Sequence, residues 1–192
     1  MGLALVLVGY VALLVGYQSY QQHRLTGAWS NDHPTASIAD ATFIPSGATG
    51  PRLRAHLADG EPVARLSIPS IGFNAIVSEG VGSGMLTSGP GHDDRTGYPG
   101  ESRVILIGNH NGFSLSWNDI KPGAGVIVEM SYGRYRYTVS KRLIVDGDDT
   151  VVVSQPRRSE TLLLSTCWPL WQGTFARQRL VFEAMPAAGA NP

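Results

Sequence analysis

From about Gly60 onward, the chain consists of short apolar or alternating runs separated by polar and glycine-rich segments. Runs of roughly four to eight such residues, bounded by turn-forming residues, are typical of β-strands. No long amphipathic helical pattern separates them, so the pattern predicts an all-β fold, a closed β-barrel of about eight strands, rather than a parallel α/β sheet. The predicted strands are residues 63–68, 73–77, 103–108, 126–130, 134–139, 141–145, 151–153, 162–166 and 180–182. Residues 79–100 are expected to form a loop around a short turn or helix.

The first twenty residues have a different pattern. Residues 2–17 carry no charge, and a helix that also includes residues 18–20 comes close to the roughly 30 Å of hydrocarbon in a bilayer. A signal peptide is the alternative, but the basic start and the small-residue cleavage site typical of one are not seen. We predict a transmembrane anchor over residues 1–20. Its orientation is weakly specified, because His23 and Arg24 follow the segment and no Lys or Arg precedes it.

Residues 21–60 are rich in Thr, Ser, Ala, Gly, Asp and Asn and predict a linker or stalk. A short helix at about residues 35–42, packed on the domain edge, is the alternative. The folded domain is expected to span residues 61–186, followed by a disordered tail at 187–192. The 15 basic and 15 acidic residues balance, so charge gives no reason to expect nucleic acid as a partner.

Cys167 is the only cysteine in the chain and ends the apolar run that begins at Thr161. An internal disulfide is therefore excluded. A thiol at a strand end is well placed for chemistry, although a lone cysteine is more often a small buried hydrophobic residue. Because a free thiol has a pKa of about 8.5, it needs a neighbouring base or cation to act as a nucleophile at neutral pH.

The candidate base is His110, which emerges just after the apolar run 103–108. A solvated loop histidine is the alternative interpretation. His92 is expected to lie in a loop, and lining of the cleft is the alternative. The candidate cation is Arg179, which opens the last predicted strand, whereas Arg177 lies nearer the preceding loop. An arginine in such a place is usually an exposed edge charge, but acyl transfer needs a donor for the developing oxyanion, and the combination suggests that chemistry.

Together these patterns resemble the sortases, the membrane-anchored cysteine transpeptidases of bacterial surfaces. The resemblance covers about residues 63–184. It rests on Leu163-Leu164-Ser165-Thr166-Cys167, on Ile107-Gly108-Asn109-His110 and on Arg179-Leu180-Val181-Phe182-Glu183-Ala184. Residues 89–92, 96–101 and 115–128 also look like sortase sequence. Asn109 stands where many sortases have Gly, and Ser102-Arg103 replaces a common Gly-Asn, so the subclass, D- or E-like, stays open.

The resemblance implies a mechanism. Cys167 would attack the Thr–Gly bond of an LPxTG-like sorting signal and form a thioester. His110 would protonate the leaving amine and later deprotonate the acceptor amine, and Arg179 would stabilise the oxyanion. Thr166 is expected to help position the peptide, unless it serves only as a β-forming residue. No cofactor or metal is expected.

The resemblance also implies partners and a location. The substrates would be surface proteins with a C-terminal sorting signal, and the acceptor would be a peptidoglycan precursor or a pilin lysine. The catalytic domain would lie outside the cytoplasm, held at the bacterial membrane. Two alternatives stay open: a thiol hydrolase or peptidase of the cell envelope, and a non-catalytic surface β-barrel that binds peptides.

Overall fold

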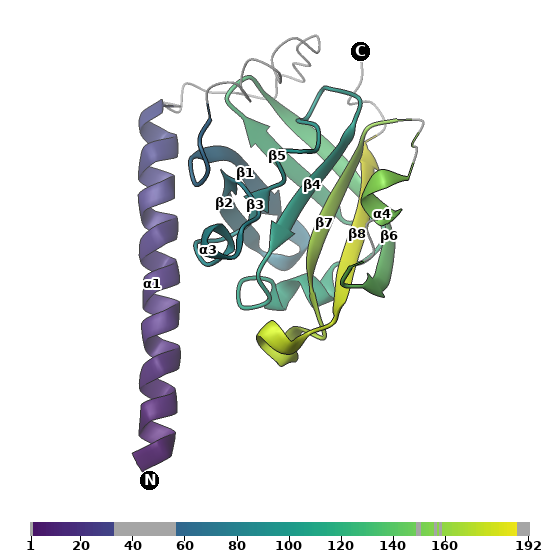
Figure 1. The fold of residues 1–192 in the computed structure, drawn as a ribbon. Helices are drawn as coiled ribbons and strands as arrows, with labels where there is room; N and C mark the ends of the chain where they lie inside the picture. Colours follow the sequence, from purple (N-terminus) through teal and green to yellow (C-terminus); the bar gives the residue numbers. More distant parts are fainter. Residues whose placement is uncertain (1, 33–56, 149–150, 156, 158, 188–192) are drawn as a thin grey trace.

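The structure is a computed structural model that describes residues 2–32, 57–148, 151–155, 157 and 159–187. Within these residues, eight strands form a closed barrel in the order β1-β2-β3-β4-β7-β8-β6-β5 (Figure 1). This confirms the predicted closed β-barrel. The strands are β1 (Pro62–Ile68), β2 (Phe73–Glu79), β3 (Gly91–His92), β4 (Val104–Asn109), β5 (Gly125–Met130), β6 (Gly133–Asp146), β7 (Thr161–Trp168) and β8 (Gln178–Pro186).

Short helical segments fill the connections between the strands. They are η1 (Pro69–Ile71), α3 (Ser83–Leu86), η2 (Leu115–Asp119), α4 (Val151–Ser154) and η3 (Leu170–Phe175). Two of them, η2 and η3, follow β4 and β7, so they lie at the ends of the strands that carry the candidate residues.

Alternate side chains of each strand fill the barrel interior. In β4, Ile105 and Ile107 are buried in the core, while Leu106 between them packs on the outside. This period of two is the geometry of an extended strand with one face turned to a core. Because Val104 and Leu106 pack against the outer cluster that contains Val152, β4 is apolar on both faces and forms a continuous apolar run in the sequence. The interior is completed by large buried side chains from several strands and from η2: Leu66, Ile68, Trp117, Met130, Tyr137, Leu162 and Phe182.

The pairing of β4 with β7 sets the position of the candidate residues. These strands run parallel, with Val104 opposite Thr161 and Asn109 opposite Thr166. On its other side β7 pairs antiparallel with β8, and Cys167 lies opposite Arg179. Because the carboxyl ends of parallel strands meet at the same edge of a sheet, the residue after β4 emerges beside the end of β7.

Two of the strand predictions are corrected by the structure. Residues 151–153 form the helix α4 rather than a strand. Their valines favour an extended chain locally, but Val152 is buried against Leu163 and Val181 on the outer face of the sheet, and this packing decides the conformation. The two strands predicted at 134–139 and 141–145 are the single strand β6, in which a register shift between Val139 and Lys141 interrupts the alternation.

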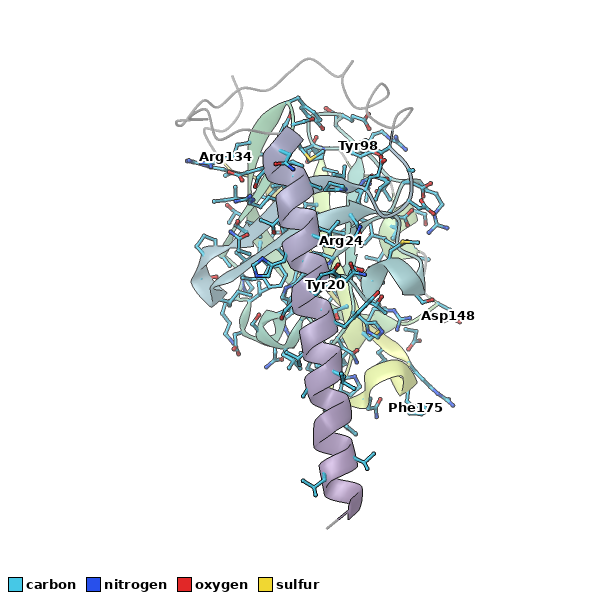
Figure 2. The ribbon with its side chains drawn as sticks, turned by 90° about the vertical axis from the view of Figure 1, so that its left-hand side faces the viewer. Tyr20, Arg24, Tyr98, Arg134, Asp148 and Phe175 are labelled. Atoms are coloured by element: carbon cyan, nitrogen blue, oxygen red, sulfur yellow. The ribbon has the colours of Figure 1, made fainter. Side chains whose placement is uncertain are left out.

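Helix α1 (Gly2–Asp32) runs along the side of the barrel and extends past one end of it (Figures 1 and 2). Its contacts with the barrel come from its second half. The Gln22 side-chain amide donates to the carbonyl oxygens of Ser88 at 2.7 Å and Ile76 at 3.2 Å, and its oxygen accepts from the Ile76 amide at 2.9 Å. Trp29 is buried. These contacts hold the helix against β2.

The helix also bears on the predicted domain boundaries. It continues beyond residue 20, so residues 21–32 of the predicted linker are helical. Residues 33–56, which include the alternative helix at 35–42, and residues 188–192 of the predicted tail lie outside the described residues. Across the described part of the chain, no helix is both long and apolar enough to cross a membrane.

Candidate active site

Three candidate residues lie at the ends of three neighbouring strands. His110 directly follows β4, Cys167 is the second-last residue of β7, and Arg179 is the second residue of β8. The pairings of Asn109 with Thr166 and of Cys167 with Arg179 place His110 and Arg179 on either side of Cys167. The fold thus brings together three residues that are widely separated in the sequence.

Cys167 faces the outside of the barrel. In β7, Leu162 and Leu164 belong to the barrel core, whereas Leu163 packs against α4 on the outer face. Cys167 shares the parity of Leu163 and is half-buried. A half-buried thiol on an outer face is accessible to a substrate, and it does not fit the alternative of a cysteine that only fills the core.

Asn111 holds the ring of His110. His110 Nδ1 lies 2.8 Å from Asn111 Oδ1, and because an amide oxygen only accepts, Nδ1 is the donor. Asn111 Nδ2 in turn donates to the carbonyl oxygen of Leu170 in η3 at 3.2 Å. In the neutral ring this arrangement leaves Nε2 as the nitrogen without a proton, which is the form a general base needs. Asn111 was not predicted from the sequence, although its position directly after His110 was a signal.

Thr166 lies beneath the site rather than on its surface. It is buried, and its hydroxyl is hydrogen-bonded to that of Ser114, which is also buried. Ser114 Oγ donates to the carbonyl oxygen of His110 at 3.0 Å, so Thr166 is the donor to Ser114. The two hydroxyls tie the end of β7 to the turn that carries His110. Thr166 is thus placed to position His110, and its hydroxyl is not presented to a peptide.

Arg179 and Arg177 differ in their surroundings. Arg179 lies opposite Cys167, so the two side chains share one face of the sheet. It is half-buried, and its Nη1 donates to the carbonyl oxygen of Gln178 at 3.0 Å. Arg177 precedes β8, its side chain is exposed, and its carbonyl oxygen accepts from the Gly147 amide at 2.7 Å. This arrangement favours Arg179 over Arg177 as the cation of the site.

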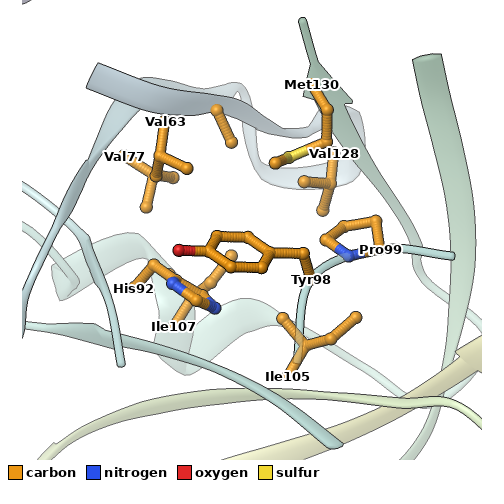
Figure 3. Close-up of a pocket in the computed structure, with 10 residues that line it drawn as sticks. Val63, Val77, His92, Tyr98, Pro99, Ile105, Ile107, Val128 and Met130 are labelled. Carbon is orange, nitrogen blue, oxygen red and sulfur yellow. The ribbon is translucent and has the colours of Figure 1, made fainter. Parts of the chain in front are cut away.

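His92 lies in strand β3 rather than in the expected loop, and it is buried away from the three strand ends. Its Nε2 donates to the carbonyl oxygen of Gly97 at 2.9 Å, and its Nδ1 lies 3.0 Å from Glu79 Oε1. The ring also stacks on Tyr98, with 4.4 Å between centroids. Figure 3 shows both rings beside a cavity of about 10 Å³ among apolar side chains, which is room for a water molecule at most.

The described residues contain no group of three or more His, Cys, Asp or Glu side chains that could hold a metal ion. What the site offers chemically is a thiol, an imidazole with a fixed tautomer and a guanidinium. These three groups suffice for covalent acyl transfer, in which a nucleophile, an acid–base group and an oxyanion donor act in turn.

Residues 66–187 match the family model described as the sortase domain. Sortase D of Bacillus subtilis (strain 168) is 31% identical over 111 residues, which are 57% of this chain and 56% of that protein. The chain therefore spans about half the length of this curated relative.

Solved structures share the fold. A sortase D5 transpeptidase of Clostridium perfringens aligns with a TM-score of 0.70 at 18% identity, over 88% of this chain and 99% of that one. Sortase E of Streptomyces avermitilis aligns with a TM-score of 0.58 at 24% identity, over 68% and 91%. At these identities the likeness shows the barrel architecture.

Proposed function

Because this chain belongs to the sortase family, we propose that it is a cysteine transpeptidase that cleaves an LPxTG-like sorting signal between Thr and Gly. The acyl group then passes to an amine. The observation that carries this proposal is the placement of Cys167 between His110 and Arg179 at three adjacent strand ends. The half-buried, outward-facing thiol supports it as well.

Acylation uses the three groups in sequence. The thiol proton of Cys167 passes to Nε2 of His110, and the sulfur attacks the threonine carbonyl carbon of the signal. The guanidinium of Arg179 stabilises the negative charge on the carbonyl oxygen. The C–N bond then breaks, and the glycine amine leaves with the proton held by His110. Removing one such oxyanion donor from an enzyme costs about 10²–10³-fold in kcat.

Deacylation reverses the proton transfers. An acceptor amine gives a proton to His110 and attacks the thioester, the C–S bond breaks, and the thiol of Cys167 is restored. Asn111 and the Thr166–Ser114 pair act through His110: the first fixes its tautomer, and the second fixes its backbone. We assign these side chains positioning roles, in place of the substrate contact expected for Thr166.

The proposal extends to partners and location. The substrates are surface proteins with a C-terminal sorting signal, and the acceptor is a peptidoglycan precursor or a pilin lysine. Residues 1–20 attach the chain to the bacterial membrane, residues 21–60 link this anchor to the barrel, and residues 61–186 form the catalytic domain outside the cytoplasm. The uncharged stretch at 2–17 and the exposed side chains of Leu5, Val6 and Leu13 support this arrangement.

The test uses the full chain with a fluorogenic sorting peptide and an amine acceptor. Amine-dependent product should form with the natural chain and be lost in Cys167→Ala. Arg179→Ala should lower kcat by about 10²–10³-fold, whereas the matched variant Arg177→Ala should keep its activity. Cleavage that does not depend on the amine would instead indicate a thiol hydrolase. If no thioester adduct appeared by intact-mass measurement, the enzymatic proposal would fail.

A further inference from the structure

The segment that follows the candidate nucleophile exposes two large aromatic side chains. Within the described part of the chain, Trp171 and Phe175 are the most exposed large hydrophobic residues, at 80% and 85%. Both belong to η3, the short helical segment that comes directly after β7 and Cys167. Single exposed hydrophobic residues are ordinary, but neighbouring large ones mark an interaction surface.

The local structure fixes how η3 is presented. At its start, the carbonyl oxygen of Leu170 accepts from Asn111, and inside it Gly173 has φ 59° and ψ −134°, which separates two short helical turns. A further exposed apolar side chain comes from the other loop at this end. Leu115, in η2 beyond His110, is 63% exposed. Exposed apolar residues therefore come from both loops that border the site.

Helix α1 extends toward the same end of the molecule. Figures 1 and 2 are related by a turn about the vertical axis, and in both the N-terminal half of α1 continues below the barrel on the side where η3 lies; Phe175 is labelled there in Figure 2. Leu5, Leu13 and Val15 on this half are exposed, and residues 2–17 carry no charge. Thus η3 and the first half of α1 both expose apolar side chains at the same end of the molecule.

We infer that this end of the barrel contacts a lipid bilayer, with η3 at the membrane interface and the first half of α1 in the apolar layer. A bilayer can take both elements at once, because its hydrocarbon accepts an uncharged helix and its headgroup region favours Trp and other aromatic side chains. The inference rests on the membrane attachment in the proposed function. It adds that η3, and with it the end of β7 that carries Cys167, lies at the membrane surface.

The test measures where η3 lies in the full chain bound to vesicles of phosphatidylethanolamine and phosphatidylglycerol. In a Cys167→Ala background, Phe175→Cys and the control Val151→Cys each provide one thiol for an environment-sensitive fluorophore. Val151 is also exposed, but it lies on α4, higher on the barrel in Figure 1. We expect a blue shift, quenching by spin-labelled lipid and loss of quenching by iodide at position 175. At position 151 we expect none of the three.

Two results would overturn the inference. In one, the chain binds the vesicles but the label at 175 stays as open to iodide as the label at 151. In the other, the chain does not bind the vesicles. Neither readout needs a sorting peptide. If the labelled chains give the expected quenching while the natural chain, with Cys167 intact, fails to transfer acyl groups, the proposed function alone is overturned.

Discussion

Replacing His92 with alanine should destabilise the barrel more than replacing its partner Glu79. Both side chains are almost fully buried, at 3% and 4% exposure. His92 Nε2 faces the carbonyl oxygen of Gly97, and Nδ1 faces the Glu79 carboxyl. Since Gly97 offers only an acceptor, Nε2 carries a proton, and a second proton is shared between Nδ1 and Glu79. Removing His92 leaves the buried Glu79 carboxyl without its hydrogen-bond partner, whereas removing Glu79 leaves Nδ1 of His92 without one.

The magnitudes follow from what each variant leaves buried. His92→Ala leaves a carboxylate without its partner, and breaking a buried ion pair in this way costs about 3–5 kcal/mol. Glu79→Ala leaves a neutral imidazole that keeps its bond to Gly97 and lacks one partner at Nδ1, which costs about 1–3 kcal/mol. Glu79→Gln is the matched control, because its amide can donate to Nδ1 of a neutral ring and keep both hydrogen bonds.

Thermal and urea unfolding of the full chain, followed by circular dichroism, would check this order. At about 2–4 °C per kcal/mol, His92→Ala should lower Tm by roughly 10 °C at pH 7, and Glu79→Gln should have the smallest effect. The reasoning is refuted if Glu79→Ala proves worse than His92→Ala, or if Glu79→Gln matches it.

Asn111→Ala should lower kcat by about tenfold or more with little change in KM, because general acid–base catalysis depends on the orientation of His110; Asn111→Asp, which keeps an acceptor for Nδ1, should recover part of the loss. An unchanged pH–rate profile in Asn111→Ala would contradict this role. Burial, followed by the nearby Glu160, raises the pKa of Tyr137 well above its ordinary value. Tyr137 therefore contributes to the stability of the folded protein below about pH 10, and this contribution is lost as the pH rises further. Spectrophotometric titration should then show Tyr137 ionising only as the protein unfolds, and ionisation near pH 10 in the folded state would refute it. Asn109→Val should raise Tm, because neither amide atom has a partner among the described residues and burying such a group costs about 1–3 kcal/mol; a lower Tm would mean that the amide has a partner.

The strand ends were predictable from the sequence because burial in a sheet has a local signature. A run such as 103–108 shows where an apolar strand stops, so the polar residues just beyond it are expected near a strand end. His110 and Cys167 were identified in this way, and the structure places both at strand ends. The family resemblance drawn from the same residues is confirmed by the match of residues 66–187.

Contacts between distant segments could not be predicted in this way. A local pattern does not say which backbone group a polar side chain will meet, so the bonds of Asn111 to Leu170 and of Gln22 to Ile76 had no signature. The contact of His92 with Glu79 depends on the parallel pairing of β2 with β3. Strand β3 is too short to be predicted from an alternation of apolar and polar residues. Val152 shows the reverse case, in which packing overrides a local preference.

The position of β8 in the barrel has a consequence for how the protein is made. β8 comes last among the described strands in sequence, yet it lies between β7 and β6. During synthesis, at about 5–20 residues per second, β7 therefore emerges before β8 exists. The edges of β6 and β7 that pair with β8 stay unpaired until residues 178–186 follow. The pairing of β6 with β8, which are separated in the sequence by β7, is non-local and therefore slower to form than a hairpin. A chain cut short before β8 would lack both Arg179 and a closed barrel, so the thiol, imidazole and guanidinium come together only in the last step of biogenesis.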